Sequence, residues 1–423
     1  MTQGILRALL AGSSAALLIS APALWAQDQA QNVPLTFGVS QSFQTLNNAG
    51  FDDPPGGNTT TSITSLSFGS STVTPTDSLR FTAGVGIAIR RDPDGNINTS
   101  VNSPNVALRY ARTTSASAVT AYVSYALDQL DQLRSPLDFM GDDGQIVLPS
   151  NPADLTSTGL KQDVRAGGSL ELGRDALFGL TITASAEQIS YTDTTDPSLL
   201  DMDTASVGIE GRFSYSPQGD VTLGISAEHQ LTLESPQDIQ RDTQDLTLGT
   251  SYDVSPVLTL SGFVQYEIVD ETDLAQTRNP RAQVAAEYTL PNGSLSFRLG
   301  DQDTSLSYQQ NLPTGAISAT LTHGLDDSGN GTLDQIGINY SQAINDVSGL
   351  DMALFYSSGT GSTTSPDVTS SGLTISYNHQ ITKDWGMNLG ANFRLRDPSS
   401  NTANTASSAG VFLTVSRNVN FLR

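Results

Sequence analysis

Apolar and polar residues alternate with a period of two along most of this chain. In the segment 257–270, Leu260 and Val264 fall on one face, and Thr259 and Gln265 fall on the other. An amphipathic helix would instead place its apolar residues at positions i, i+3 and i+4. The pattern therefore predicts β-strands, and we expect an all-β fold.

The same alternation recurs in about twenty segments. Near the C-terminus, Leu389 and Ala391 alternate with Asn388 and Asn392. The predicted strands are 34–46, 58–69, 79–91, 104–112, 117–127, 159–173, 177–191, 203–215, 220–234, 244–254, 257–269, 280–290, 294–301, 304–311, 315–325, 332–344, 350–357, 371–381, 385–396 and 409–421. Most of them reach the length of about nine to eleven residues that a tilted strand needs to cross a bilayer.

The connections between these segments alternate in length. Turns of two to five residues, such as Ser255-Pro256, alternate with longer loops, of which 128–158 is the longest. Two connections break the rule, because 70–78 is too long for a turn and 301–303 is too short for a loop. Short turns at one end and long loops at the other are typical of outer-membrane barrels. We therefore predict a single up-and-down antiparallel transmembrane β-barrel of about 20 strands, with 18 as the alternative.

Aromatic residues lie near strand ends on the apolar face. They are Tyr125, Tyr215, Tyr252, Tyr266, Tyr288, Tyr340, Tyr356, Tyr377 and Trp385. Amphipathic rings favour the depth of the lipid headgroups and form girdles around membrane barrels. This placement favours a membrane barrel over a soluble β-repeat protein.

Residues 1–26 have the features of a secretory signal peptide. Arg7 is the only charged residue before Asp28, and a stretch rich in Leu and Ala ends in small residues at Ala26. This order is typical of a segment removed during Sec-type export. We expect cleavage after Ala26, with cleavage after Ala23 as an alternative, and a barrel domain over 27–423.

The charge of the chain excludes some classes of function. There are 20 Lys and Arg residues against 43 Asp and Glu, which gives a net charge of −23, and there is no Cys. Nucleic-acid binding needs a basic face, so we expect no nucleic-acid partner. The absence of Cys excludes disulfides and thiolate metal sites.

The last strand, 409–421, alternates up to Phe421. It resembles the C-terminal strand of Gram-negative outer-membrane β-barrel (porin-like) proteins, which usually ends on the aromatic residue itself, whereas Leu422 and Arg423 follow here. The resemblance implies recognition by the barrel-assembly machinery and a place in the bacterial outer membrane among lipid and lipopolysaccharide. It identifies no specific family and transfers no functional residue.

Charged residues on the polar face are the candidate lumen-lining residues. Alternation assigns to this set Arg80, Arg90, Arg109, Arg165, Glu171, Glu210, Arg212, Glu228, Glu267, Glu287, Arg298, Arg394 and Arg396. A lumen with charges of both signs suits a water-filled channel, and it equally suits a barrel sealed by Arg–Glu pairs. The long loop 128–158 either folds into the lumen or caps the barrel from outside.

Few side chains in the sequence suggest reactive chemistry. His229, His323 and His379 are far apart in the sequence, and no catalytic motif is present. The run from Asp92 to Asn98 offers four oxygen ligands as a weak Ca²⁺ candidate, although its residue types also suit an ordinary turn. Those four residues are Asp92, Asp94, Asn96 and Asn98.

The sequence therefore predicts an outer-membrane barrel that acts as a porin-like passive channel for small polar solutes. The alternative is a structural or surface-interaction barrel with a closed lumen, including one that exports an envelope polymer. We expect no enzyme activity and no cofactor. Homo-oligomerisation is left open by the sequence.

Overall fold

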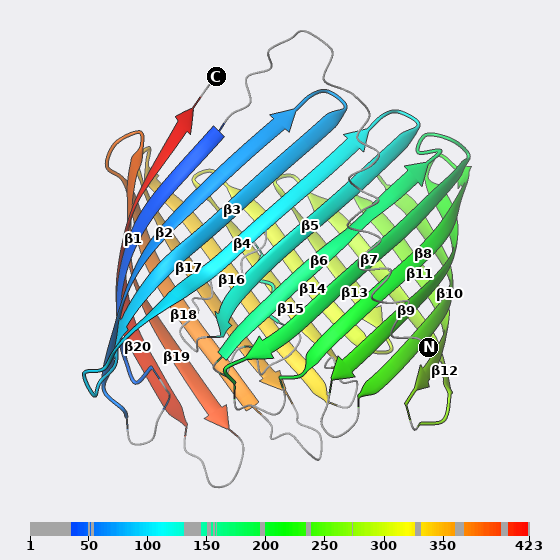
Figure 1. Ribbon diagram of the computed structural model, residues 1–423. Helices are drawn as coiled ribbons and strands as arrows, with labels where there is room; N and C mark the ends of the chain where they lie inside the picture. The colour runs from blue at the N-terminus through cyan, green and yellow to red at the C-terminus, as the bar shows by residue number, and fades with distance from the viewer. Residues whose placement is uncertain are drawn as a thin grey trace, which may run out of the picture.

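The chain forms one continuous β-sheet that closes on itself (Figure 1). The computed structural model describes residues 35–49, 51, 55–130, 145–149, 154, 157, 159–194, 199–233, 238–272, 274–325, 331–359, 368–398 and 405–421. The predicted signal peptide, residues 1–26, lies outside them. Within these ranges, no helix is long and apolar enough to cross a membrane.

Twenty strands make up the sheet. The first ten are β1 (Leu35–Asn47), β2 (Asn58–Val73), β3 (Asp77–Arg91), β4 (Ile97–Thr113), β5 (Ser117–Leu130), β6 (Gly159–Leu172), β7 (Phe178–Thr192), β8 (Asp201–Ser216), β9 (Gly219–Leu233) and β10 (Ile239–Ser255). The others are β11 (Leu258–Glu271), β12 (Thr277–Leu290), β13 (Gly293–Gly300), β14 (Asp303–Leu312), β15 (Gly315–Leu325), β16 (Thr332–Asn345), β17 (Ser348–Gly359), β18 (Val368–Gln380), β19 (Trp385–Pro398) and β20 (Ala406–Phe421). The predicted fold class and strand number are confirmed.

Each strand pairs antiparallel with the next one along the chain, and β1 pairs with β20 to close the barrel. The closing pair runs from Leu35 opposite Phe421 to Asn47 opposite Ala409. In Figure 1 the blue and red strands therefore lie side by side, and β20 ends at the upper edge. Because the strand number is even, both β1 and β20 have their terminal ends at this edge, which we call the termini side.

The turns on the termini side are short, and most connections at the opposite edge, the loop side, are longer. One predicted exception disappears, because β2 continues to Val73 and leaves only residues 74–76 as a turn. The other exception is real, since residues 301–302 join β13 to β14 on the loop side. β13 and β14 are also the two shortest strands, with 8 and 10 residues.

Strand β4 begins seven residues before the predicted position 104. A register shift between Gly84 and Gly86 of β3 lies opposite Ser103, whose φ of 44° is in the left-handed region. Such a β-bulge adds one residue to a strand and reverses which side chains face each side of the sheet. The alternation is broken at this point, so the first part of β4 could not be recognised from the sequence pattern.

The two faces of the sheet differ in the way that the alternation predicts. On one face, Leu260, Val264 and Leu389 are 44%, 56% and 49% exposed. On the other face, Glu267 and Asn392 are 4% and 6% exposed. Side chains on the outside of a closed sheet diverge and those on the inside converge, so the apolar face is convex and the polar face is concave.

Aromatic rings are concentrated at the ends of the convex face. The pairing register places all nine aromatic residues named above on this face, and it adds Tyr110, Phe178, Phe213, Tyr308 and Phe421. Most of them lie within five residues of a termini-side strand end. The result is an apolar belt bordered by an aromatic girdle, as expected for a barrel in a bilayer.

Candidate functional site

The concave face of the barrel forms the candidate site. Residues that are direct partners on neighbouring strands point to the same side of a sheet, so the register can be followed around the ring. It places on the concave face all thirteen candidate residues, namely Arg80, Arg90, Arg109, Arg165, Glu171, Glu210, Arg212, Glu228, Glu267, Glu287, Arg298, Arg394 and Arg396. The role of these thirteen residues in lining a solute pathway remains a prediction.

Two ion-pair clusters lie on the concave face toward the loop side. The Arg165 guanidinium on β6 contacts the Asp163 carboxylate at 2.8 Å and the Glu187 carboxylate of β7 at 2.7 Å. The Arg281 guanidinium of β12 lies 2.6 Å from Glu267 of β11. Asp163, Glu187 and Arg281 follow the same alternation but are not among the thirteen residues predicted from the sequence.

Several candidate residues serve the turns rather than the open interior. The Arg212 guanidinium donates to the carbonyl oxygens of Gly173 and Arg174, at 3.1 and 2.6 Å, and so holds the β6–β7 turn. Glu171 pairs with the side chain of Arg174 at 3.2 Å. At the loop side, Arg90 pairs with Asp92 at 2.6 Å. These three candidates stabilise the edges of the barrel.

The remaining wall, from β14 through β20 to β1 and β2, is almost neutral. Its described inward residues are mainly Ser, Thr, Asn, Gln and Gly. Among these described positions the charged ones are Asp303, Asp351, Arg394 and Arg396. The interior thus has a charged half, from β3 to β13, and a neutral half.

A segment of the long β5–β6 connection lies against the neutral half. Residues 145–149 form what we call the inner segment. Its backbone carbonyl at Ile146 accepts a hydrogen bond from Thr320 at 3.2 Å, and that at Pro149 accepts one from Gln335 at 2.7 Å. The Ser307 hydroxyl donates to the side-chain oxygen of Gln145 at 2.8 Å. These partners lie on three strands: Ser307 and Thr320 are at the middle of β14 and β15, and Gln335 is nearer the loop-side end of β16.

An apolar contact fixes the inner segment as well. Ile146 and Leu148 pack against Ala353 and Phe355 of β17, and Phe355 is only 1% exposed. Gly337 lies beneath Ile146, and a Cβ there would come within 2.9 Å of the Ile146 Cβ. A larger residue at this position would push the inner segment away from the wall.

The same connection is anchored a second time near its own strands. Asp154 is buried, and its carboxylate contacts the Lys161 ammonium at 2.5 Å and accepts a hydrogen bond from the Tyr191 hydroxyl at 3.0 Å. Lys161 lies at the loop-side end of β6, whereas the inner segment contacts β14 to β17. Since β15 lies ten strands from β5 in a ring of twenty, this one connection touches opposite walls of the barrel.

The three histidines do not meet. His229 pairs with Asp242 at 2.5 Å and His323 with Asp334 at 2.6 Å, both on the convex face toward the loop side. The nearest approach to a catalytic arrangement is on the termini side, where the Ser348 hydroxyl lies 2.9 Å from Nδ1 of His379.

In the described part of the chain, the Ser348–His379 pair lacks the third member of a hydrolase site. Tyr377 donates a hydrogen bond to the Ser348 hydroxyl at 2.9 Å. A triad needs a carboxylate or amide that orients the base, and among the described residues none is recorded in contact with His379.

The weak Ca²⁺ candidate forms the β3–β4 turn. Both carboxylate oxygens of Asp92 are engaged, by Arg90 at 2.6 Å and by the Asn98 amide at 3.0 Å. Asp94 accepts a hydrogen bond from the Asn96 backbone at 3.0 Å, and Gly95 has a φ of 89°. Within the described chain no group of three metal-ligating side chains is found. The residues therefore serve as turn formers in this structure.

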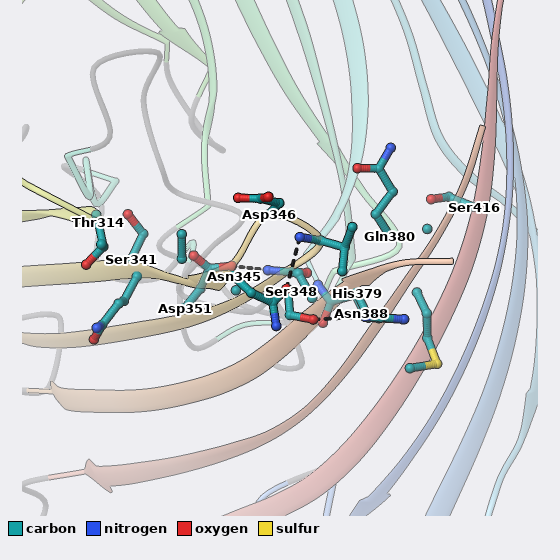
Figure 2. Close-up of a pocket in the computed structure, with 18 of the residues that line it drawn as sticks. Thr314, Ser341, Asn345, Asp346, Ser348, Asp351, His379, Gln380, Asn388 and Ser416 are labelled. Carbon is teal, nitrogen blue, oxygen red and sulfur yellow. Dashed lines mark hydrogen bonds between the residues drawn. The ribbon is translucent and has the colours of Figure 1, made fainter. Parts of the chain in front are cut away.

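A cavity of about 900 Å³ opens on the concave face at the termini side (Figure 2). It lies between the β14–β15 turn, the β16–β17 turn and the adjoining parts of β18, β19 and β20. Side chains that line it include Ser341, Asp351, Asn378, Asn388 and Ser416. The Asn378 amide donates a hydrogen bond to the Asp351 carboxylate.

No family model and no curated protein matches the sequence. Solved structures with a similar fold include the siderophore receptor PirA from Pseudomonas aeruginosa, with 9% identity, a TM-score of 0.45 and coverage of 93% of this chain and 81% of that one. Pseudomonas aeruginosa OccK7 (OpdD) has 10% identity and a TM-score of 0.40, and the match covers 93% of this chain and 100% of that one. The copper transporter OprC has 10% identity and a TM-score of 0.46, with coverage of 93% and 81%.

The closed sheet, the apolar convex belt and the aromatic girdle decide the class of the protein. In hydrocarbon every backbone polar group needs a partner, and a barrel that lacks free edges provides one for each. The chain is a transmembrane β-barrel with the architecture of outer-membrane proteins. Its apolar belt faces outward, and its concave face encloses the interior of the barrel.

Proposed function

We propose that this barrel is a passive channel for small polar solutes and that the inner segment narrows its lumen. The observation that carries the proposal is the position of residues 145–149 against β14 to β17, at mid-height inside a wall of polar side chains. A segment held against the inner wall reduces the cross-section of the lumen.

The polarity of the wall supports passage of hydrated solutes. Hydroxyl and amide groups along the neutral half can exchange hydrogen bonds with water or solute one group at a time. On the charged half, Arg165 and Arg281 are already paired with carboxylates at 2.7 and 2.6 Å. Such pairs keep the wall hydrophilic while reducing the affinity of any single charge for a passing ion.

The same ion pairs favour the second candidate function, a structural barrel with a closed lumen. If the lumen is filled, the Arg–carboxylate clusters connect neighbouring strands and stabilise the barrel. The loop side then serves as a surface for interaction or polymer export. No catalytic role is proposed on either reading. Export through the signal peptide 1–26, insertion by the barrel-assembly machinery, contact with lipopolysaccharide and homo-oligomerisation belong to the proposal in both cases.

Single-channel recording separates these two functions. The refolded barrel, inserted into a planar bilayer in 1 M KCl, is expected to give discrete, ohmic conductance steps. Liposomes that carry the barrel should swell in small polar solutes and not in large ones. Insertion verified by heat-modifiable gel mobility but without conductance or swelling would contradict the channel and leave the structural barrel.

A further inference from the structure

The termini-side cavity has a composition that selects for one class of solute. Amides, hydroxyls and carboxylates line it, namely Asn378, Asn388, Ser341, Thr414, Ser416, Asp346 and Asp351. Each amide both donates and accepts hydrogen bonds, and each hydroxyl does the same. A partner that suits this wall must also carry donors and acceptors close together.

The amide of Asn388 has unused hydrogen-bonding capacity. Its side-chain oxygen is buried and receives no hydrogen bond in the described structure. A buried acceptor without a donor costs free energy, so an orientation of the amide that turns this oxygen toward a hydroxyl donor in the cavity is favoured.

Rotation makes the Asn388 amide available from the cavity. The residue lines the cavity and is half-buried. A half-turn about its Cβ–Cγ bond exchanges the oxygen and the NH₂ group, so either end can face the solute. Gly349 and Gly386 on the neighbouring inward positions carry no side chain, which leaves the floor of the cavity open.

The charges that line the cavity disfavour anions. Asp346 and Asp351 both line it, and their carboxylates repel a negatively charged solute. Carboxylate oxygens also accept hydrogen bonds, so a neutral solute with several hydroxyl donors can bind them without that repulsion.

We propose that this cavity is a binding site for a neutral polyhydroxy solute, a sugar or sugar alcohol. Vicinal hydroxyls of the solute donate to Asn388 and to the Asp351 carboxylate, and accept from Asn378 and Ser416. The inference rests on the proposed function for the passage of the solute through the barrel, and it names the class of solute that passes. Binding itself does not depend on passage.

Calorimetric titration of maltotriose into the purified barrel tests the site. The detergent must lack a sugar headgroup, since a maltoside would compete. Saturable binding is expected for maltotriose, and none for tetraethylene glycol, which has ether oxygens but few donors. Asn388→Leu should weaken binding by about tenfold, and Asn388→Gln, which keeps the amide, should weaken it less.

Thr183→Leu is the matched control, because Thr183 faces inward on β7, on the opposite, charged half of the wall. It should leave binding unchanged, and gel mobility and circular dichroism should confirm that every variant is folded. Equal heats for maltotriose and tetraethylene glycol, no maltotriose binding, or binding insensitive to Asn388→Leu would each overturn the site. Conductance without sugar binding would leave the channel standing, and sugar binding without conductance would overturn only the channel.

Discussion

At the scale of single residues, the side of the sheet on which a residue lies decides the consequence of changing it. Leu389 and Asn388 are neighbours on β19, yet Leu389 is 49% exposed on the convex face and Asn388 lines the cavity inside. One residue along a strand therefore separates lipid from water. This separation is the most direct property to test.

Leu389→Arg should reduce the free energy of unfolding by about 2–4 kcal/mol, because it places a charge in the hydrocarbon region. Asn388→Arg on the same strand should cost far less, since its guanidinium can reach the water of the cavity. Urea titrations of the barrel in liposomes measure both values. Equal losses for the two variants would mean that the assignment of faces on β19 is wrong.

The Arg281–Glu267 pair offers a second test at this scale. Glu267 is 4% exposed and also accepts a hydrogen bond from Asn279 at 3.1 Å. Arg281→Met leaves a buried carboxylate without its cation and should cost about 3 kcal/mol or more. The double variant with Glu267→Gln should recover most of that loss in the same urea titration. A double variant no more stable than Arg281→Met alone would show that the pair is not coupled.

At the scale of elements, the alternation of apolar and polar residues was sufficient to predict every strand. Each strand has one face toward lipid and the other toward the polar interior of the barrel. It failed at the start of β4, where the Ser103 bulge reverses the alternation. It also placed all thirteen candidates on the concave face but could not show that Arg212 holds a turn. That role depends on which strands meet, and a single sequence does not contain this information.

The inner segment is the element that the sequence left undecided. Loop 128–158 could cap the barrel or enter it, because its described anchors, Ser307, Thr320 and Gln335, are ordinary polar residues of distant strands. Nothing in their local sequence marks them as partners of a loop that precedes them by more than 150 positions.

An engineered cross-link can verify the position of the inner segment. The chain contains no Cys, so Gln145→Cys with Ser307→Cys introduces the only two thiols. A short, reducible bifunctional thiol reagent should join them, because the Gln145 Oε1 and Ser307 Oγ atoms of the original side chains lie 2.8 Å apart. A shift in gel mobility that reverses on reduction measures the cross-link. Gln145→Cys with Thr183→Cys, on the opposite wall, should form no cross-link, and similar cross-linking in both pairs would contradict the location.

At the scale of the whole molecule, the distribution of charge governs which ions enter. The chain has 43 acidic and 20 basic residues, whereas the thirteen candidate wall residues include eight Arg and five Glu. The excess negative charge therefore lies outside this wall set. Exposed charges are screened beyond about 8 Å at physiological salt, so their influence depends on ionic strength.

Ion selectivity should for that reason change with salt concentration. We expect weak selectivity at 1 M KCl and a shift toward cations at about 10 mM, where the Debye length reaches roughly 30 Å. Reversal potentials measured across a fixed salt gradient at both strengths give the permeability ratio. Strong anion selectivity under both conditions would show that the wall arginines dominate the field.

The pairing of β1 with β20 has a consequence for how the barrel is made. Every other pairing joins strands that are consecutive in the chain and can form as a local hairpin. The closing pair joins Leu35 to Phe421 and can form only after all the other strands exist. Until then the sheet has two long open edges whose unpaired backbone groups invite aggregation. Contacts so distant in sequence also form slowly. Closure of the barrel is thus the slowest step of biogenesis, and until it happens both sheet edges are open to aggregation. This is a physical reason for a catalyst that holds both edges until they meet.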